Sequence, residues 1–357
     1  LLGSRGLGDV YKRQGLSFDI YTASERIYVS LSGLEESFTE GLTLFEHILK
    51  NAKPDETALK GLIDDAFKKR DDAKKDKNTI FWRALYSYGA YGEKSEFRDK
   101  LSEKELKSIT ADELVSKIKE LLQYQHSIFY YGQNDAKDVV KTLTKHHKTP
   151  RKLKPYPKPP VYTEQETKKD KVIFVNYDMV QAKIMMLSKD QAFNPEVMPE
   201  ARVFGEYFGS GLSSIVFQEI REARALAYSA FAGYRTPSQA DKSHFVQGFM
   251  SVQADKMKDA IIAMRELLNE MPKAEQQFEG SRVSVLKQLE TERITKTRVF
   301  FDYLKAKDLG LDYDKREKIY KKAQKMSFSD LEAFFNKNIK SKNFTFLVMG
   351  NKETLDM

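Results

Sequence analysis

The segment Met326–Asn351 reads MSFSDLEAFFNKNIKSKNFTFLVMGN, and a related segment, ITADELVSKIKELLQYQHSIFYYGQN, spans Ile109–Asn134. In the earlier segment Thr110 is followed three places later by an acidic residue, which is a typical start of a helix. The helix leads into HSIFYYG, which reads as a strand. The later segment repeats this order of helix, strand and glycine. Equivalent residues lie 217 or 218 positions apart: Leu114 and Leu331, Gly132 and Gly350.

The correspondence extends upstream. A strand followed by an amphipathic helix is predicted over Tyr28–Leu49 and again over Gly248–Leu268, and Leu49 lies 219 positions before Leu268. Two copies of one unit of strands and helices are the simplest explanation. We therefore expect an α+β protein made of two tandem homologous domains, each an antiparallel sheet covered by helices.

The repeat also predicts the domain boundaries. Residues 15–147 would form the first domain and residues 171–357 the second. Residues 148–170 would be a proline- and lysine-rich linker, because five of the ten prolines fall between Pro150 and Pro160. The first copy has far fewer residues before its strand than the second, so we expect its N-terminal part to be missing. We expect the second copy to be clipped at its C-terminal end.

The first fourteen residues, LLGSRGLGDVYKRQ, have neither the apolar core of a signal peptide nor a period that joins them to the rest. Part of this stretch resembles the translation of an adapter used in preparing sequencing libraries. Residues 1–14 are therefore interpreted as an artefact.

Composition excludes several classes of protein. The 357 residues include no cysteine, which rules out disulfides, thiolate zinc sites and a cysteine nucleophile. No apolar run approaches the roughly 18 residues of a membrane span. The formal charge of +8 comes from lysines spread among acids, as in Ala66–Asn78. This pattern is typical of a solvated helix surface rather than of a nucleic-acid site.

Two kinds of site find no support. None of the five histidines begins or ends an H-x-x-E-H or H-E-x-x-H motif, so no catalytic metal site can be built from this chain. The glycine-rich GSGLSS at Gly209–Ser214 lacks the preceding strand and the lysine of a phosphate-binding loop. It is interpreted as a tight turn between helices, capped by Ser213 or Ser214. Trp82, the single tryptophan, is expected to pack in a layer of helices.

Arg221 and Tyr228 are the candidate site residues. They lie seven residues apart in SSIVFQEIREARALAYSAFAGY, across a predicted helix-to-strand junction. Val216, Ile220 and Ala223 are expected to turn inward on the helix, and Tyr228 to share a strand face with Ala230 and Ala232. A guanidinium and a phenol are hydrogen-bond donors that suit a peptide carbonyl or its oxyanion. Alternatively, Arg221 forms a surface ion pair with Glu219 or Glu222, and Tyr228 is ordinary strand packing.

The same stretch resembles the C-terminal-half signature of the insulinase and pitrilysin-type zinc metallopeptidases, the inverted zincins. In that signature a glycine-serine turn, an LFQ-x-LRE helix and GLAYSV follow one another. The resemblance implies a fold of the LuxS/mitochondrial-processing-peptidase-like type, with residues 15–147 as part of a third peptidase-type domain and residues 171–357 as a fourth. It also implies that Arg221 and Tyr228 bind the substrate carbonyl. Ala223 and Ala225 depart from the longer residues of many relatives.

The resemblance implies a substrate-binding half of a zinc metalloendopeptidase that hydrolyses peptides or small unfolded proteins in an enclosed chamber. Zinc would be held by the missing N-terminal half or by a homologous zinc-bearing subunit, so this chain alone should be inactive. The alternative is a non-catalytic partner or structural subunit, and a nucleic-acid-binding module is a distant third. By analogy with exported bacterial relatives, a periplasmic location is expected.

Overall fold

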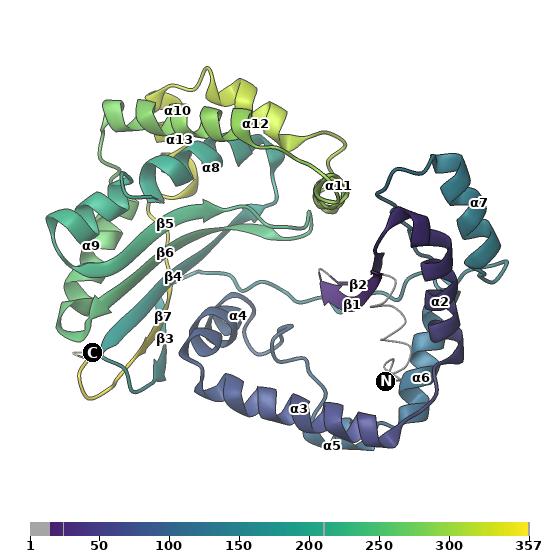
Figure 1. The fold of residues 1–357 in the computed structure, drawn as a ribbon. Helices are drawn as coiled ribbons and strands as arrows, with labels where there is room; N and C mark the ends of the chain where they lie inside the picture. The colour runs from purple at the N-terminus through teal and green to yellow at the C-terminus, as the bar shows by residue number, and fades with distance from the viewer. Residues whose placement is uncertain (1–14, 24, 210, 356–357) are drawn as a thin grey trace. The chain divides into compact units, whose positions relative to one another are not determined.

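The computed structural model describes residues 15–23, 25–209 and 211–355, so the interpretation of residues 1–14 as an adapter lies outside the described residues. The chain divides into two units. Unit 1 comprises the residues up to Asp72 and the segment Lys100–Val161, and unit 2 comprises Ala73–Asp99 and the residues from Tyr162 onward (Figure 1). The helix α3 (Glu56–Lys75) runs across this boundary. Residues 73–99 therefore belong with the second unit, although the repeat predicted residues 15–147 as one domain.

Unit 1 consists of a two-stranded antiparallel ribbon and helices. The strands are β1 (Ser17–Ala23) and β2 (Arg26–Ser32). Besides most of α3, the described helices of this unit are α2 (Phe38–Asn51), α5 (Glu103–Ser108), α6 (Ala111–Glu120) and α7 (Ala136–His146), with short 3-10 turns at Glu35–Ser37 and Leu121–Gln123. The predicted capping box is confirmed, because Thr110 accepts from the backbone of Glu113 and the Glu113 side chain accepts from Thr110.

The strand predicted over His126–Gly132 is wrong, because none of these residues is in a strand. Backbone N–H groups just after Gly132 donate to a carboxylate side chain instead of to a neighbouring strand. The carboxylate of Glu35 accepts the backbone N–H groups of Gln133 at 3.0 Å and Asn134 at 3.2 Å, and it also bonds the hydroxyl of Tyr130. A strand exists only where a neighbour pairs with it, and within the described part of unit 1 no segment pairs with these residues.

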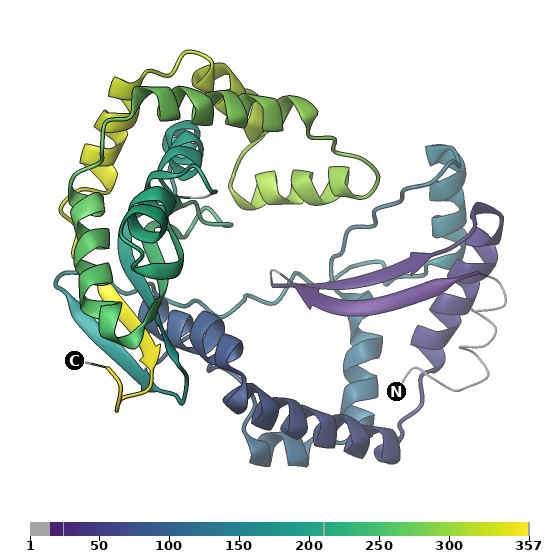
Figure 2. The ribbon, with the colours of Figure 1, turned by 60° about the vertical axis from the view of Figure 1, so that its left-hand side comes forward.

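Unit 2 is built on a five-stranded sheet in the order β3-β7-β4-β6-β5, labelled in Figure 1 and turned by 60° in Figure 2. The strands are β3 (Lys171–Asn176), β4 (Gln181–Ala192), β5 (Ala227–Arg235), β6 (Ser243–Gln253) and β7 (Thr345–Gly350). The pairs β4·β7, β4·β6 and β5·β6 are antiparallel, whereas β3·β7 is parallel. The sheet is thus mixed rather than wholly antiparallel as predicted.

Helices cover both faces of this sheet. Alternate strand residues such as Met186, Met250 and Val348 are buried against helices on one face. These helical segments are α8 (Met198–Phe204), η5 (Gly205–Gly209), η6 (Phe217–Ala223), α9 (Met257–Asn269), α10 (Glu275–Thr291), α12 (Lys315–Ala323) and α13 (Phe328–Asn338). The other face packs against Phe81 and Leu85 of η2 (Thr79–Leu85) and against Tyr86, the first residue of α4 (Tyr86–Tyr91).

The repeat is visible in matched elements. In each unit a strand leads through a single 3-10 turn into an amphipathic helix, β2 into α2 and β6 into α9 through Ala254–Lys256. Likewise, α6 and α13 both begin with a capping box, formed by Thr110 in the first and Ser327 in the second. The strand β7 has no equivalent among the described residues of unit 1.

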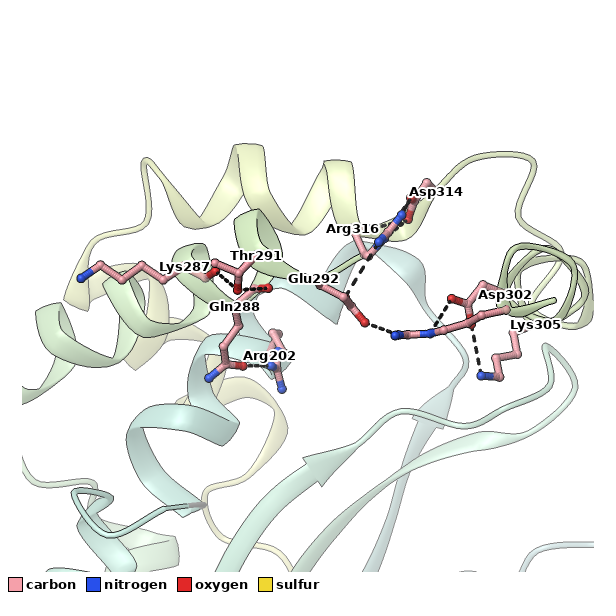
Figure 3. A network of polar contacts seen from close by, with 10 residues as sticks. Arg202, Lys287, Gln288, Thr291, Glu292, Asp302, Lys305, Asp314 and Arg316 are labelled. Atoms are coloured by element: carbon pink, nitrogen blue, oxygen red, sulfur yellow. Dashed lines mark hydrogen bonds and ion pairs between the residues drawn. The ribbon is translucent and has the colours of Figure 1, made fainter. Parts of the chain in front are cut away.

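Helix α11 (Arg298–Asp308) is held in part by charges (Figure 3). It contains no buried residue, and Tyr303 is exposed. Arg298 bonds Glu292 and lies 3.4 Å from the carboxylate of Asp302. Arg316 joins the same cluster, 3.9 Å from Glu292. Ionic contacts therefore tie the beginning of α11 to the end of α10 and the beginning of α12.

Candidate substrate-binding site

The turn at Gly209–Ser214 is shaped by glycine and serine, as expected. A Cβ on Gly209 would lie 1.4 Å from the carbonyl oxygen of Ala232, so only glycine fits there. Gly211 has φ +99°, which side chains rarely adopt. The hydroxyl of Ser214 accepts from the backbone of Phe217 at 3.4 Å and donates to the carbonyl of Gly211. The prediction of a serine-capped turn is confirmed, with Ser214 as the cap.

Arg221 lies on the exposed side of η6, a segment wound as a π-helix. Val216 and Ile220 are fully buried as predicted, but Ala223 is exposed. The prediction for Ala223 was wrong because a π-helix is wound more widely than the α-helix whose period it assumed. The guanidinium lies over the ring of Phe217, 4.7 Å from its centroid, and 3.7 Å from the carboxylate of Glu222.

The ion pair with Glu222 is the alternative role for Arg221. It is long and exposed, and such pairs contribute about 0 to 1 kcal/mol. The guanidinium has five N–H donors, so one such pair leaves donors for another acceptor. Glu219, the other expected partner, lies instead near Arg224, at 3.9 Å.

A tight junction joins the helix of Arg221 to the strand of Tyr228. The backbone N–H of Leu226 donates to the carbonyl of Ile220 at 2.9 Å. Ala225 has φ +47°, in the left-handed region that disfavours residues with a Cβ. Lys256 donates to the carbonyl of Ala225 at 3.0 Å and so braces this turn. Strained backbone of this kind persists where the surroundings hold it, often at binding sites.

Tyr228 lies at a bulge in β5. Ala227 pairs with Val252 and Ser229 with Ser251, so Tyr228 is the extra residue. The prediction that it shares a face with Ala230 and Ala232 is wrong: its side chain is 52% exposed, whereas theirs are buried. The bulge breaks the alternation and turns the phenol out of the core.

The phenol has one described hydrogen-bond partner. Nε2 of Gln253 donates to its oxygen at 3.0 Å. Gln253 follows Val252, which is buried in the helix-covered core, so its side chain points to the opposite face of the sheet. Because a hydroxyl carries a single proton and that proton is not used by Gln253, Tyr228 can donate it to another acceptor.

Sequence reasoning missed Gln253 and Lys256. The register of the antiparallel pair β5 and β6 places Gln253 beside Tyr228. The bulge that turns Tyr228 towards Gln253 had no signal in the sequence.

The described residues offer no group of three or more histidine, cysteine, aspartate or glutamate side chains that could hold a metal ion. In unit 1 His126 and His147 bond each other and His146 bonds Thr43. In unit 2 His244 is fully buried, and burial lowers its pKa. These side chains do not fit a catalytic zinc.

Part of the chain matches the model of a known protein family. Residues 108–282 match the model of the peptidase M16 inactive domain, and this range includes Arg221 and Tyr228. The chain carries a peptidase M16 inactive domain. The resemblance to insulinase and pitrilysin-type peptidases, which form the M16 family, is thereby confirmed. No curated protein sequence matches the chain significantly.

Several solved structures share the fold. The peptidase M16 inactive domain from Pseudomonas fluorescens is 13% identical with a TM-score of 0.69, over 97% of this chain and 83% of that one. The periplasmic protease PqqL from Escherichia coli is 13% identical with a TM-score of 0.70, over 98% of this chain and 39% of PqqL. The ferredoxin protease FusC, solved with Arabidopsis ferredoxin, is 13% identical with a TM-score of 0.70, over 98% of this chain and 38% of FusC.

This M16 chain therefore spans well under half of PqqL and FusC. At these identities the similarity concerns the fold. Among the helices of the described residues, none is both long and apolar enough to cross a membrane.

Proposed function

We propose that this M16 chain is the substrate-binding, zinc-free half of a metalloendopeptidase that hydrolyses peptides or small unfolded proteins in an enclosed chamber. The observation that supports the proposal is a pair of exposed donors, Arg221 and Tyr228, on either side of one braced junction. Their spacing and surroundings match the signature to which the sequence is similar.

The chemistry follows from the donors. When water attacks a peptide carbonyl, its oxygen becomes an oxyanion, and donors already in place stabilise that charge. Arg221 contributes a permanent positive charge, and Phe217 beneath it limits the motion of the guanidinium. Tyr228 contributes the proton that Gln253 does not use. Both groups would contact the scissile carbonyl.

Zinc would come from outside these residues. Since they do not fit the metal, its ligands would belong to a further half of the same protein or to a homologous subunit. We propose peptide and protein substrates by analogy with FusC, whose structure contains ferredoxin, and a periplasmic location by analogy with PqqL.

The proposal is tested with the chain and a fluorescently labelled unfolded peptide. Loss of one neutral hydrogen bond costs about 0.5 to 1.5 kcal/mol, so Tyr228→Phe should weaken binding about 2- to 10-fold. Arg221→Ala removes a charged donor and should weaken it at least tenfold. Arg298→Ala and Tyr303→Phe are matched controls, exposed residues of the same types outside the site.

Equal binding by all four variants would overturn the assignment of the site. Combining the chain with a zinc-bearing M16 half then distinguishes the two functions. Tyr228→Phe should lower turnover about 10- to 1000-fold if the pair stabilises the oxyanion. Peptide binding without turnover in that mixture would identify the non-catalytic partner instead.

A further inference from the structure

Trp82, the single tryptophan of the chain, has an exposed indole on the sheet of unit 2. It was expected to pack among helices, but its ring lies 4.7 Å from that of Phe249 and 6.4 Å from that of Phe231, measured between centroids. Phe231 and Phe249 are themselves paired residues of β5 and β6 and stack at 5.1 Å. These three side chains are called the aromatic shelf below.

The shelf is not required to hold η2 on the sheet. Phe81 and Leu85 of the same segment are 2% and 3% exposed and anchor it there. Trp82 by contrast keeps 37% of its surface exposed. The indole packs parallel to the ring of Phe231, with an interplanar angle of 12°, and stays open to solvent. It therefore presents an apolar surface to a ligand.

The shelf lies on the same face of the sheet as the phenol of Tyr228. Phe231 is three residues after Tyr228 on β5, which corresponds to about 10 Å at the rise of a strand. Ser229, the outward residue between them, is small and exposed, so no large side chain of β5 separates the two. The distance equals two to three residues of an extended peptide.

We propose that the aromatic shelf is a subsite for an aromatic or large aliphatic side chain of the peptide, two to three residues from the carbonyl that Arg221 and Tyr228 bind. The inference rests on the proposed function and adds a substrate preference to it. An extended peptide held by its carbonyl at Tyr228 and running along β5 carries one of its side chains over Trp82. Burial of that side chain against the indole favours binding.

The single tryptophan makes the subsite directly observable. Two unfolded peptides are compared on the unchanged chain, identical except that one carries phenylalanine and the other serine two to three residues from the central peptide bond. The phenylalanine peptide should bind about 2- to 10-fold more tightly, which is the factor that an added aromatic pair contributes. Only this peptide should change the emission of Trp82.

Variants separate the shelf from the carbonyl site. Trp82→Ser should remove the preference between the two peptides, measured by fluorescence anisotropy of the labelled peptides, and Trp82→Phe should restore most of it. Tyr228→Phe should weaken both peptides equally and leave their ratio unchanged.

The outcomes decide between the two proposals. If Arg221→Ala and Tyr228→Phe weaken binding but the two peptides bind equally and the emission stays constant, the subsite is overturned and the proposed function stands. If both variants bind as the unchanged chain does, the proposed function fails. A preference for phenylalanine that persists in Trp82→Ser also overturns the subsite. The comparison of the two peptides on the unchanged chain tests the subsite without relying on the folding of any variant.

Discussion

Residues 109–134 of unit 1 and 326–351 of unit 2 have similar sequences but different structures in their second halves. Both begin with a capped helix. In unit 2 the apolar run after the helix becomes β7, which is buried along its length and pairs with β3 and β4. In unit 1 the corresponding run forms no strand. The comparison shows that the helix is specified locally, whereas the strand requires its neighbours.

The largest effect expected from this difference concerns Leu347 and its counterpart Phe129. Leu347 is 1% exposed between the sheet and η2, so Leu347→Ala should lower the free energy of unfolding by about 2 to 5 kcal/mol. Phe129 is 39% exposed, and Phe129→Ala should cost under about 1 kcal/mol. Urea denaturation measures both, and similar losses would contradict the comparison.

Unit 2 also buries a histidine, and its stability should depend on pH for that reason. Burial holds the pKa of His244 below its usual 6.5. Below about pH 6.5 the unfolded chain therefore binds the proton before the folded chain does, and the free energy of unfolding falls by up to about 1.4 kcal/mol per pH unit. Above that pH the stability from this residue is complete.

His244→Gln removes this titration. The difference in unfolding free energy between the variant and the unchanged chain, measured by denaturation from pH 8 to pH 5, should shrink as the pH falls. A difference that stays constant with pH would rule out His244 as the source.

The two capped helices should respond alike. Thr110→Ala and Ser327→Ala each remove a side chain that accepts from the third residue of its helix, and each should cost about 1 kcal/mol. Hydrogen exchange of the first turn of α6 and of α13 measures the two effects separately. A loss at one helix only would break the equivalence of the repeats at their best-matched element.

The smallest effect is expected at α11, where unit 2 relies on exposed charges. Arg298→Ala removes the contacts with Glu292 and Asp302, and because the pairs are exposed it should cost well under 1 kcal/mol. Raising the salt concentration should produce a similar increase in hydrogen exchange within α11. Hydrogen exchange elsewhere in unit 2 should stay constant. A uniform increase would contradict the view that these ion pairs stabilise α11 alone.

Much of this structure could be predicted because the signals were local. The period of Phe38–Asn51, the cap at Thr110 and the strand-then-helix pattern of Gly248–Leu268 each identified their elements from neighbouring residues alone. The inward positions of Val216 and Ile220 were predicted in the same way. The glycine-serine turn was also recognisable from its composition.

The remaining features depend on contacts between distant parts of the chain. The bulge that exposes Tyr228 appears only when β5 is aligned with β6. The parallel pairing of β3 with β7 joins strands some 170 residues apart in the sequence, and the assignment of residues 73–99 to unit 2 depends on the packing of Phe81 and Leu85. No local period carries that information.

Gly209 lies directly against the backbone of Ala232 in β5, a few residues after that strand begins. A residue with no side chain thereby sets how near the helical layer comes to β5. A side chain at position 209 would therefore move the helical layer away from β5. The spacing between the two layers would change while the side chains of Arg221 and Tyr228 stay the same.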